Sequence, residues 1–149
     1  MRKLSILMLL FIFVPLHAHA NSTQISSAQV ADKIQQNTGN KQILMIYASW
    51  CPHCRVIIPD LVTAARASTT SIVAVSMDKK SHTLKKYMNQ FGELPFELLI
   101  WDQKFSLTQA LSKVDINYNS SVPFFALINP DGSVHKQGFL SLDDIKAFI

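Results

Sequence analysis

Residues 42–54 read QILMIYASWCPHC, and this stretch decides the fold. Its first seven residues are almost wholly apolar and rich in strand formers, which is typical of a strand buried on both faces. Residues 54–67 then indicate a helix kinked at Pro59, with its apolar stripe at Val56, Ile57, Leu61, Val62 and Ala65. We therefore expect both cysteines at a turn that leads from a buried strand into a helix.

The segments around this stretch continue to alternate between helix and strand. A helix capped by Ser26 or Ser27 precedes it, and residues 71–77 indicate a second buried strand. The later segments indicate helices over 83–91 and 107–114, strands over 122–128 and 133–137, and a last helix opened by a Ser141/Asp144 capping box, with 94–101 ambiguous. This order predicts an α/β protein with helices on both faces of a mixed sheet.

The composition excludes several classes of protein. The chain has 149 residues, of which 48% are hydrophobic and 16% charged, so it is too apolar for a disordered tail and fits a single domain. Its two cysteines are too few for a disulfide framework or a four-cysteine metal site.

Residues 1–20 have the three parts of a secretory signal peptide. A basic start with Arg2 and Lys3 is followed by an apolar run over 4–16 and by the small-residue exit Ala18-His19-Ala20. The run is shorter than the ~20 residues of a membrane span. We expect cleavage after Ala20, a single domain over 21–149 and a periplasmic location. The alternative is an uncleaved anchor that holds the domain on the periplasmic side.

The net charge of +4 has no nucleic-acid motif beside it. Loss of residues 1–20 removes Arg2 and Lys3 and leaves 12 basic and 10 acidic residues. Four lysines cluster in and before the helix expected over 83–91, namely Lys79, Lys80, Lys85 and Lys86. We interpret them as a solvated helix face and expect no nucleic-acid partner.

The chemistry of the chain is expected in Cys51-Pro52-His53-Cys54. Backbone N–H groups and the helix dipole at a helix N-terminus favour the thiolate, which is the form that attacks disulfides. Pro52 suits the first helical turn, and His53 adds a donor beside the sulfur. By position, Cys51 is the expected exposed nucleophile and Cys54 the buried resolving thiol.

Two other interpretations of the cysteine pair stay open. A structural disulfide would close a loop of four residues and stabilise the fold by only about 2 kcal/mol. A copper or zinc site would need Cys51, Cys54 and His53 together with a further ligand, for which His82 and His135 are the candidates. Thiol–disulfide exchange fits the strand–helix position best, and we assign no residue to a metal.

At these residues the sequence resembles the thioredoxin-like superfamily. Residues 47–54 (YASWCPHC) are similar to its strand–aromatic–WCxxC turn, Pro59 to its helix-kinking proline, and Val122-Pro123 to its cis-proline. The resemblance implies a thioredoxin-like fold, a three-layer α/β/α structure with a central mixed sheet of four to five strands.

The same resemblance implies further site residues. The Val122–Pro123 bond is expected to be cis, with an ordinary trans proline at a strand start as the alternative. In this family the residue before the cis-proline pairs with an extended client segment, so Val122 and Pro123 are candidate substrate-binding residues. Trp50 and Pro52 are expected to line the active site.

Two branches of the superfamily are represented in the sequence. The CPHC active site resembles the DsbA-like oxidases, whereas the insert over 78–121 and the hairpin at 128–132 resemble the TlpA-like periplasmic thioredoxins. Phe124 follows Pro123 where the cytochrome-maturation reductases carry a glutamate, which argues against that role. Met45 stands six residues before Cys51, where many members carry a buried acid, so the proton acceptor for Cys54 is absent or replaced by water.

We therefore expect a monomeric thiol–disulfide oxidoreductase without a cofactor. Its partners would be client proteins with thiols or disulfides and a membrane redox partner. The direction of the reaction stays open. His53 favours an oxidant because it stabilises the reduced form, whereas the TlpA-like scaffold favours a reductase.

Overall fold

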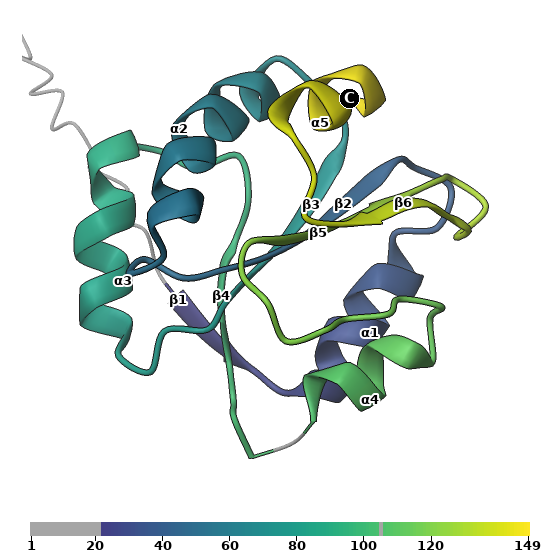
Figure 1. The fold of residues 1–149 in the computed structure, drawn as a ribbon, viewed down its shortest axis with the longest axis horizontal. Helices are drawn as coiled ribbons and strands as arrows, with labels where there is room; N and C mark the ends of the chain where they lie inside the picture. The colour runs from purple at the N-terminus through teal and green to yellow at the C-terminus, as the bar shows by residue number, and fades with distance from the viewer. Residues whose placement is uncertain (1–21, 105) are drawn as a thin grey trace, which may run out of the picture.

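The computed structural model describes residues 22–104 and 106–149, so the expected signal peptide lies outside the described residues. A six-stranded sheet runs through the centre of the molecule in the order β1-β4-β3-β2-β5-β6 (Figure 1). Its strands are β1 (Ser22–Ile25), β2 (Gln42–Tyr47), β3 (Ser71–Ser76), β4 (Leu98–Trp101), β5 (Phe124–Ile128) and β6 (Val134–Gly138). The expected mixed sheet is confirmed, but the expected number of four to five strands is wrong.

The two strands that were not predicted lie at and near one edge of the sheet. β1 pairs in parallel with β4, and β4 pairs in parallel with β3. The first three residues of β1 are polar and not buried, and their pattern predicts no strand. β4 lies in the segment 94–101 that was ambiguous, just after Pro95. Their pairing is non-local, so neither strand carries a strong local signal.

The centre of the sheet is arranged as expected. β2 and β3 are parallel, with Gln42 opposite Ser71, while β5 is antiparallel to β2, with Phe124 opposite Ile46. The C-terminal end of β2 therefore lies at the same end of the sheet as the N-terminal end of β5. The cysteine turn and Val122-Pro123 meet at this end of the sheet, although about 70 residues separate them in the chain.

Helices cover both faces of the sheet, which confirms the three layers (Figure 1). One face carries α2 (Pro52–Arg66), α3 (Ser81–Met88) with the 3-10 turn η1 (Asn89–Phe91), and α5 (Leu142–Phe148). The other carries α1 (Ser27–Gln36) and α4 (Leu107–Ser112). Successive residues of β2 point to opposite faces, so Met45 and Tyr47 pack under α2 and Ile46 under α1.

The apolar stripe of α2 differs from the expected one. Its buried residues are Cys54, Ile58, Leu61, Val62 and Ala65. Val56, which we expected in the stripe, has 77% of its surface exposed. The helix begins at Pro52 rather than at residue 54. Cys54 then marks the buried face, and Val56, two residues further, points outward.

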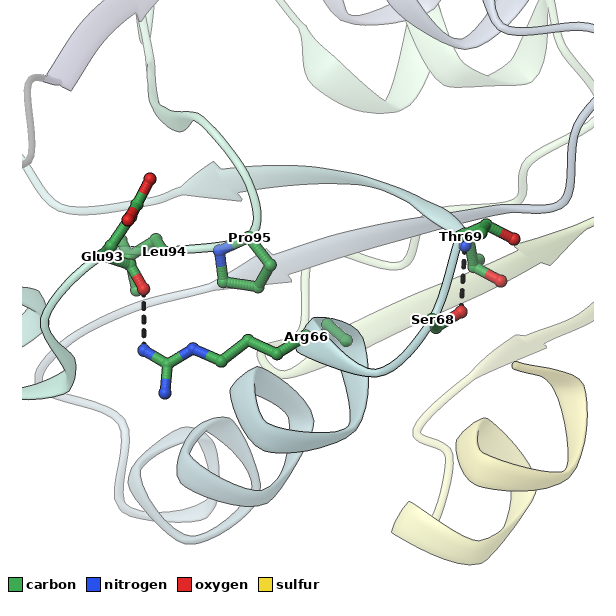
Figure 2. Close-up of a pocket in the computed structure, with 8 residues that line it drawn as sticks. Arg66, Ser68, Thr69, Glu93, Leu94 and Pro95 are labelled. Atoms are coloured by element: carbon green, nitrogen blue, oxygen red, sulfur yellow. Dashed lines mark hydrogen bonds between the residues drawn. The ribbon is translucent and has the colours of Figure 1, made fainter.

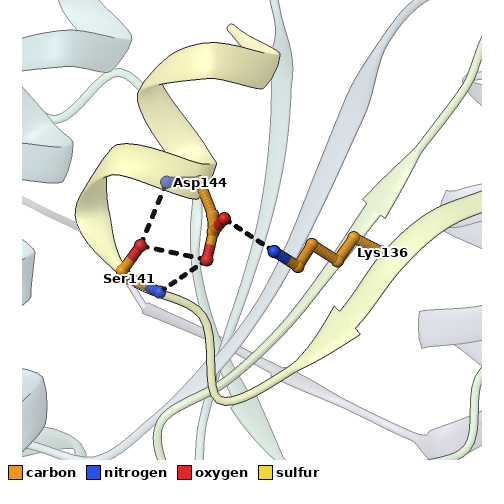
Figure 3. A network of polar contacts seen from close by, with 3 residues as sticks. All are labelled: Lys136, Ser141 and Asp144. Carbon is orange, nitrogen blue, oxygen red and sulfur yellow. Dashed lines mark hydrogen bonds and ion pairs between the residues drawn. The ribbon is translucent and has the colours of Figure 1, made fainter.

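Helix α5 begins with the predicted capping box (Figure 3). The Asp144 N–H donates to Ser141 Oγ at 3.1 Å, and the Ser141 N–H donates to Asp144 Oδ2 at 3.2 Å. Lys136 of β6 donates to Asp144 Oδ1 at 2.6 Å. These hydrogen bonds lower the pKa of the Asp144 carboxyl, the one from Lys136 being the largest cause.

We expect Ser141→Ala to destabilise the protein by about 1 kcal/mol, because alanine cannot accept the N–H of Asp144 at the start of α5. Urea unfolding measures the change. Ser112→Ala is the control, since Ser112 lies at the other end of a helix and its hydroxyl donates to the Gln109 carbonyl. Equal losses in the two variants would contradict the role of the cap.

Candidate active site

Cys51 lies at the point where the turn after β2 becomes α2. It is the N-cap of the helix, and its Sγ accepts the backbone N–H of Cys54 at 3.3 Å. The Cys51 carbonyl accepts the N–H of Arg55 at 3.1 Å, and Pro52 occupies the first turn, where its missing N–H costs nothing. The Cys51 sulfur is therefore held over the positive end of the α2 dipole, as the sequence predicted.

The two cysteines differ less in exposure than expected. Cys54 is fully buried, as predicted, but Cys51 is only 3% exposed, so its predicted exposure is wrong. The Cys51 thiol donates to the Val122 carbonyl oxygen at 3.5 Å. Because β5 runs antiparallel to β2, it brings this carbonyl onto the sulfur. Burial, helped by the hydrogen bond with Cys51, raises the pKa of Cys54 to about 12.

The Val122–Pro123 peptide bond is cis, which confirms that expectation. Pro123 is buried and Val122 is half-buried. The carbonyl of Val122 points to Cys51, so the residues that we predicted for client binding and for nucleophilic attack are neighbours in the fold.

Large apolar side chains are exposed around this turn. Trp50 has 63% of its surface exposed, and Phe139 has 67%. The ring of His53, on the first turn of α2, packs edge-on against Phe139 with 5.8 Å between ring centroids. Trp50 thus lies at the surface as predicted. Nothing in the sequence pattern singled out Phe139, which joins the site only because the chain after β6 passes α2.

The buried Asp78 holds the turn before Cys51 by hydrogen bonds, a role that was also not predicted. It is 3% exposed, and its carboxylate accepts the Ser49 N–H at 2.8 Å, the Ser49 hydroxyl at 2.6 Å and the Ser76 hydroxyl at 2.6 Å. The two serines belong to the turn before Cys51 and to the end of β3. The signal was the polar S-x-D sequence at the end of the apolar run over 71–77.

Comparison with protein families shows to which family the chain belongs. The sequence profile of the AhpC/TSA family matches residues 18–137, which is most of the chain. The chain belongs to the AhpC/TSA family. No curated protein matched in the corresponding comparison.

Solved structures place this AhpC/TSA protein in the thioredoxin-like fold. A thiol:disulfide interchange protein of the thioredoxin family from Chlorobium tepidum TLS is 23% identical, with a TM-score of 0.59 over 76% of this chain and 80% of that one. A secreted disulfide oxidoreductase of Mycobacterium tuberculosis, described as homologous to E. coli DsbE, is 17% identical, with a TM-score of 0.59 over 76% and 83%. The exposed lipoprotein thioredoxin of Streptococcus pneumoniae is 19% identical, with a TM-score of 0.56 over 77% and 87%.

The AhpC/TSA domain has a hollow far from the cysteines. A polar cavity of about 640 Å³ lies at the C-terminal end of α2, beside Arg66 and Glu93 (Figure 2). The guanidinium of Arg66 is occupied there by the carbonyl oxygens of Phe91 and Glu93. A helix of this length separates the hollow from Cys51 by about 20 Å. Size alone therefore does not locate the site.

The metal-site interpretation gains no third ligand from the structure. Within 22–104 and 106–149, no three side chains of His, Cys, Asp or Glu come together in a way that could hold a metal ion. His82 and His135 are exposed, and His135 stacks on Phe148 of α5. In the same described part of the chain, no helix has the length and apolarity of a membrane span.

Proposed function

We propose that the protein is a thiol–disulfide oxidoreductase that works through the Cys51–Cys54 couple. The observation that carries this proposal is the position of Cys51 at the N-cap of α2, with Cys54 buried behind it and the Val122 carbonyl in front. The helix dipole at that position favours the Cys51 thiolate. Cys54 lies one turn away as the resolving thiol, and the Val122 backbone lies beside Cys51, where a client segment can pair with it.

The two cysteines have different roles in the exchange. The Cys51 thiolate attacks a client disulfide, and a mixed disulfide forms while one client thiolate leaves and takes up a proton. The Cys54 thiolate then attacks the Cys51 sulfur, the bond from Cys51 to the client breaks, and the second client thiolate leaves. The client gains two electrons and two protons, and the protein keeps a Cys51–Cys54 disulfide. The oxidative direction is the reverse sequence.

The residues around the cysteines position the client. The backbone of Val122, next to Pro123, pairs with an extended client segment, while exposed Trp50 and Pro52 lie along the path of that segment. His53 assists the Cys51 thiolate by its charge when it is protonated. The combination of a TlpA-like scaffold with a DsbA-like CPHC motif supports both directions of exchange. The redox state of Cys51 in cells decides between them, since a reductase is held mostly as thiols and an oxidant mostly as the disulfide.

We also propose that the domain over 21–149 acts outside the cytoplasm after removal of residues 1–20. Two observations support this location: the signal-like pattern of residues 1–20, and two structural neighbours that are a secreted protein and an exposed lipoprotein. Its partners are then client proteins and a membrane redox partner. It works as a monomer, without a cofactor and without nucleic acid.

We expect Cys54→Ala to trap clients as mixed disulfides on Cys51. The first attack needs only Cys51, whereas release needs the thiolate of residue 54. Non-reducing electrophoresis followed by mass spectrometry of the adducts measures the trap, and Cys51→Ala/Cys54→Ala is the matched control. If the double variant captures as much client as Cys54→Ala, or if neither captures any, the proposed exchange is contradicted.

A further inference from the structure

The resolving thiol must ionise in an apolar place. Cys54 has no exposed surface, and burial raises its pKa to about 12. Met45 of β2, in the same apolar core, offers no base or hydrogen bond. The second step of exchange nevertheless needs the Cys54 thiolate. Backbone hydrogen bonds at Ala48 and Cys54 lower the pKa of Cys54 but do not offset its burial, so a further donor on the buried side would make this anion less costly.

Two tyrosine hydroxyls lie in the same core as Cys54. Tyr47 ends β2 and Tyr87 comes from α3, and both side chains lie in the core that contains Cys54. They are 0% and 8% exposed, and neither hydroxyl has a hydrogen-bond partner in the structure. A buried hydroxyl without a partner keeps the full cost of losing its hydration. Two such hydroxyls in the core that holds the Cys54 thiol, neither bonded to it in the resting state, therefore point to a use in another state.

The electrostatics of the core keep both hydroxyls as donors. Burial raises the pKa of Tyr47, and negative charge on Asp78, Tyr87 and Cys54 raises it further. Burial also raises the pKa of Tyr87; Arg55, whose guanidinium lies 5.2 Å from the centre of the Tyr87 ring, lowers it, and Cys54 raises it. Both side chains respond to charge on Cys54, and both stay protonated when that charge forms.

We propose that the hydroxyls of Tyr47 and Tyr87 donate hydrogen bonds to the Cys54 thiolate as it forms, and so accelerate release of the client. The proposal rests on the proposed function and deepens it. The Cys54 proton leaves to solvent and is balanced by the proton that the departing client thiolate takes up. The S–S bond between Cys51 and Cys54 forms as the bond between Cys51 and the client breaks.

Other charged groups face the same place and set the balance. Cys51 shares the turn with Cys54, and its hydrogen bond opposes ionisation of Cys54. On the tyrosine side, the Asp78 carboxylate raises the pKa of Tyr47, while the Arg55 guanidinium lies 5.2 Å from the centre of the Tyr87 ring and lowers the pKa of Tyr87. None of these groups is removed by a Tyr→Phe substitution, so the effect of the hydroxyl can be isolated.

A matched control exists on the other face of the sheet. Tyr118 is 4% exposed, and its hydroxyl also has no partner in the structure, but its ring packs on Phe124 in the core under α1 and α4. Tyr118→Phe therefore removes an equally buried, equally unpartnered hydroxyl that is on the opposite side of the sheet from Cys54.

The test separates the two chemical steps. A disulfide-bonded peptide whose two thiols can be followed separately is mixed with excess reduced protein, and formation and release of the mixed disulfide are timed from pH 5 to 9. For both Tyr47→Phe and Tyr87→Phe we expect formation of the mixed disulfide within twofold of wild type. Release is expected to be slower by about tenfold, since a hydrogen bond to a charged group is lost. The rise of the release rate with pH moves to higher pH, and Tyr118→Phe matches wild type.

The outcomes distinguish this inference from the proposed function. Wild-type exchange with unchanged release in both Tyr47→Phe and Tyr87→Phe would overturn the inference alone, as would equal slowing in Tyr118→Phe. Absence of exchange in wild type would overturn the proposed function and the inference with it. Two independent positions are tested, so a folding defect in one variant leaves the other to decide.

Discussion

Substitution of Cys51 by serine is expected to reduce disulfide exchange to the uncatalysed background. A serine hydroxyl does not ionise near neutral pH, and it cannot form the mixed disulfide on which the mechanism depends. The fold is expected to persist, because serine is a preferred N-cap and its oxygen can accept the N–H of Cys54 in place of the sulfur. Reduction of a protein disulfide with a chemical electron donor measures the rate.

The matched variant for this prediction is Cys54→Ser. It keeps the attacking thiol and is expected to retain the first step while losing release of the client. Thermal unfolding of both variants separates loss of chemistry from loss of fold. Retention of more than a tenth of the wild-type rate by Cys51→Ser, in a folded protein, would show that Cys51 is not the nucleophile.

Removal of the Asp78 carboxylate is expected to destabilise the protein by about 2–4 kcal/mol. In Asp78→Ala, one buried N–H and two buried hydroxyls lose their acceptor, those of Ser49 and Ser76. The turn before Cys51 loses its attachment to the end of β3, so we also expect slower exchange at a given temperature. Urea unfolding at constant pH gives the loss of free energy.

Asp60→Ala is the control for the Asp78 variant. Asp60 is an exposed aspartate on α2, and its removal is expected to change the free energy of unfolding by less than about 0.5 kcal/mol. Asp78→Asn is expected to lie between the two, because its amide oxygen still accepts while its NH₂ group faces donors. If Asp78→Ala were as stable as Asp60→Ala, the carboxylate would not hold the turn.

Local patterns were sufficient for the elements that carry the cysteines. The apolar run over 42–48, Pro52 and the following helical spacing placed both cysteines at a strand-to-helix turn, where the structure has them. The Ser141/Asp144 capping box was equally local and is present. These features are predictable because each depends on residues within one turn or one strand of the chain.

Features that depend on distant partners were missed or wrong. β1 forms because β4 pairs with it, and the polar residues of β1 do not by themselves predict a strand. Cys51 is buried and contacts the Val122 carbonyl, which no spacing around Cys51 could reveal. Asp78 and Phe139 reach the site through the ends of β3 and β6. The resemblance to the thioredoxin-like superfamily bridged one such gap, since it supplied the cis bond before Pro123.

The central claim is that Cys51 and Cys54 form one two-electron redox couple. Equilibration of the protein in glutathione buffers of known potential, followed by acid quenching and counting of free thiols by mass spectrometry, tests it most directly. We expect a single transition in which both thiols disappear together, with a midpoint between about −120 and −270 mV. A midpoint at the thioredoxin end of this range, near −270 mV, would favour a reductase, and a higher one an oxidant. Failure to form the internal disulfide at any potential, or stable glutathione adducts in its place, would show that Cys51 and Cys54 are not such a couple.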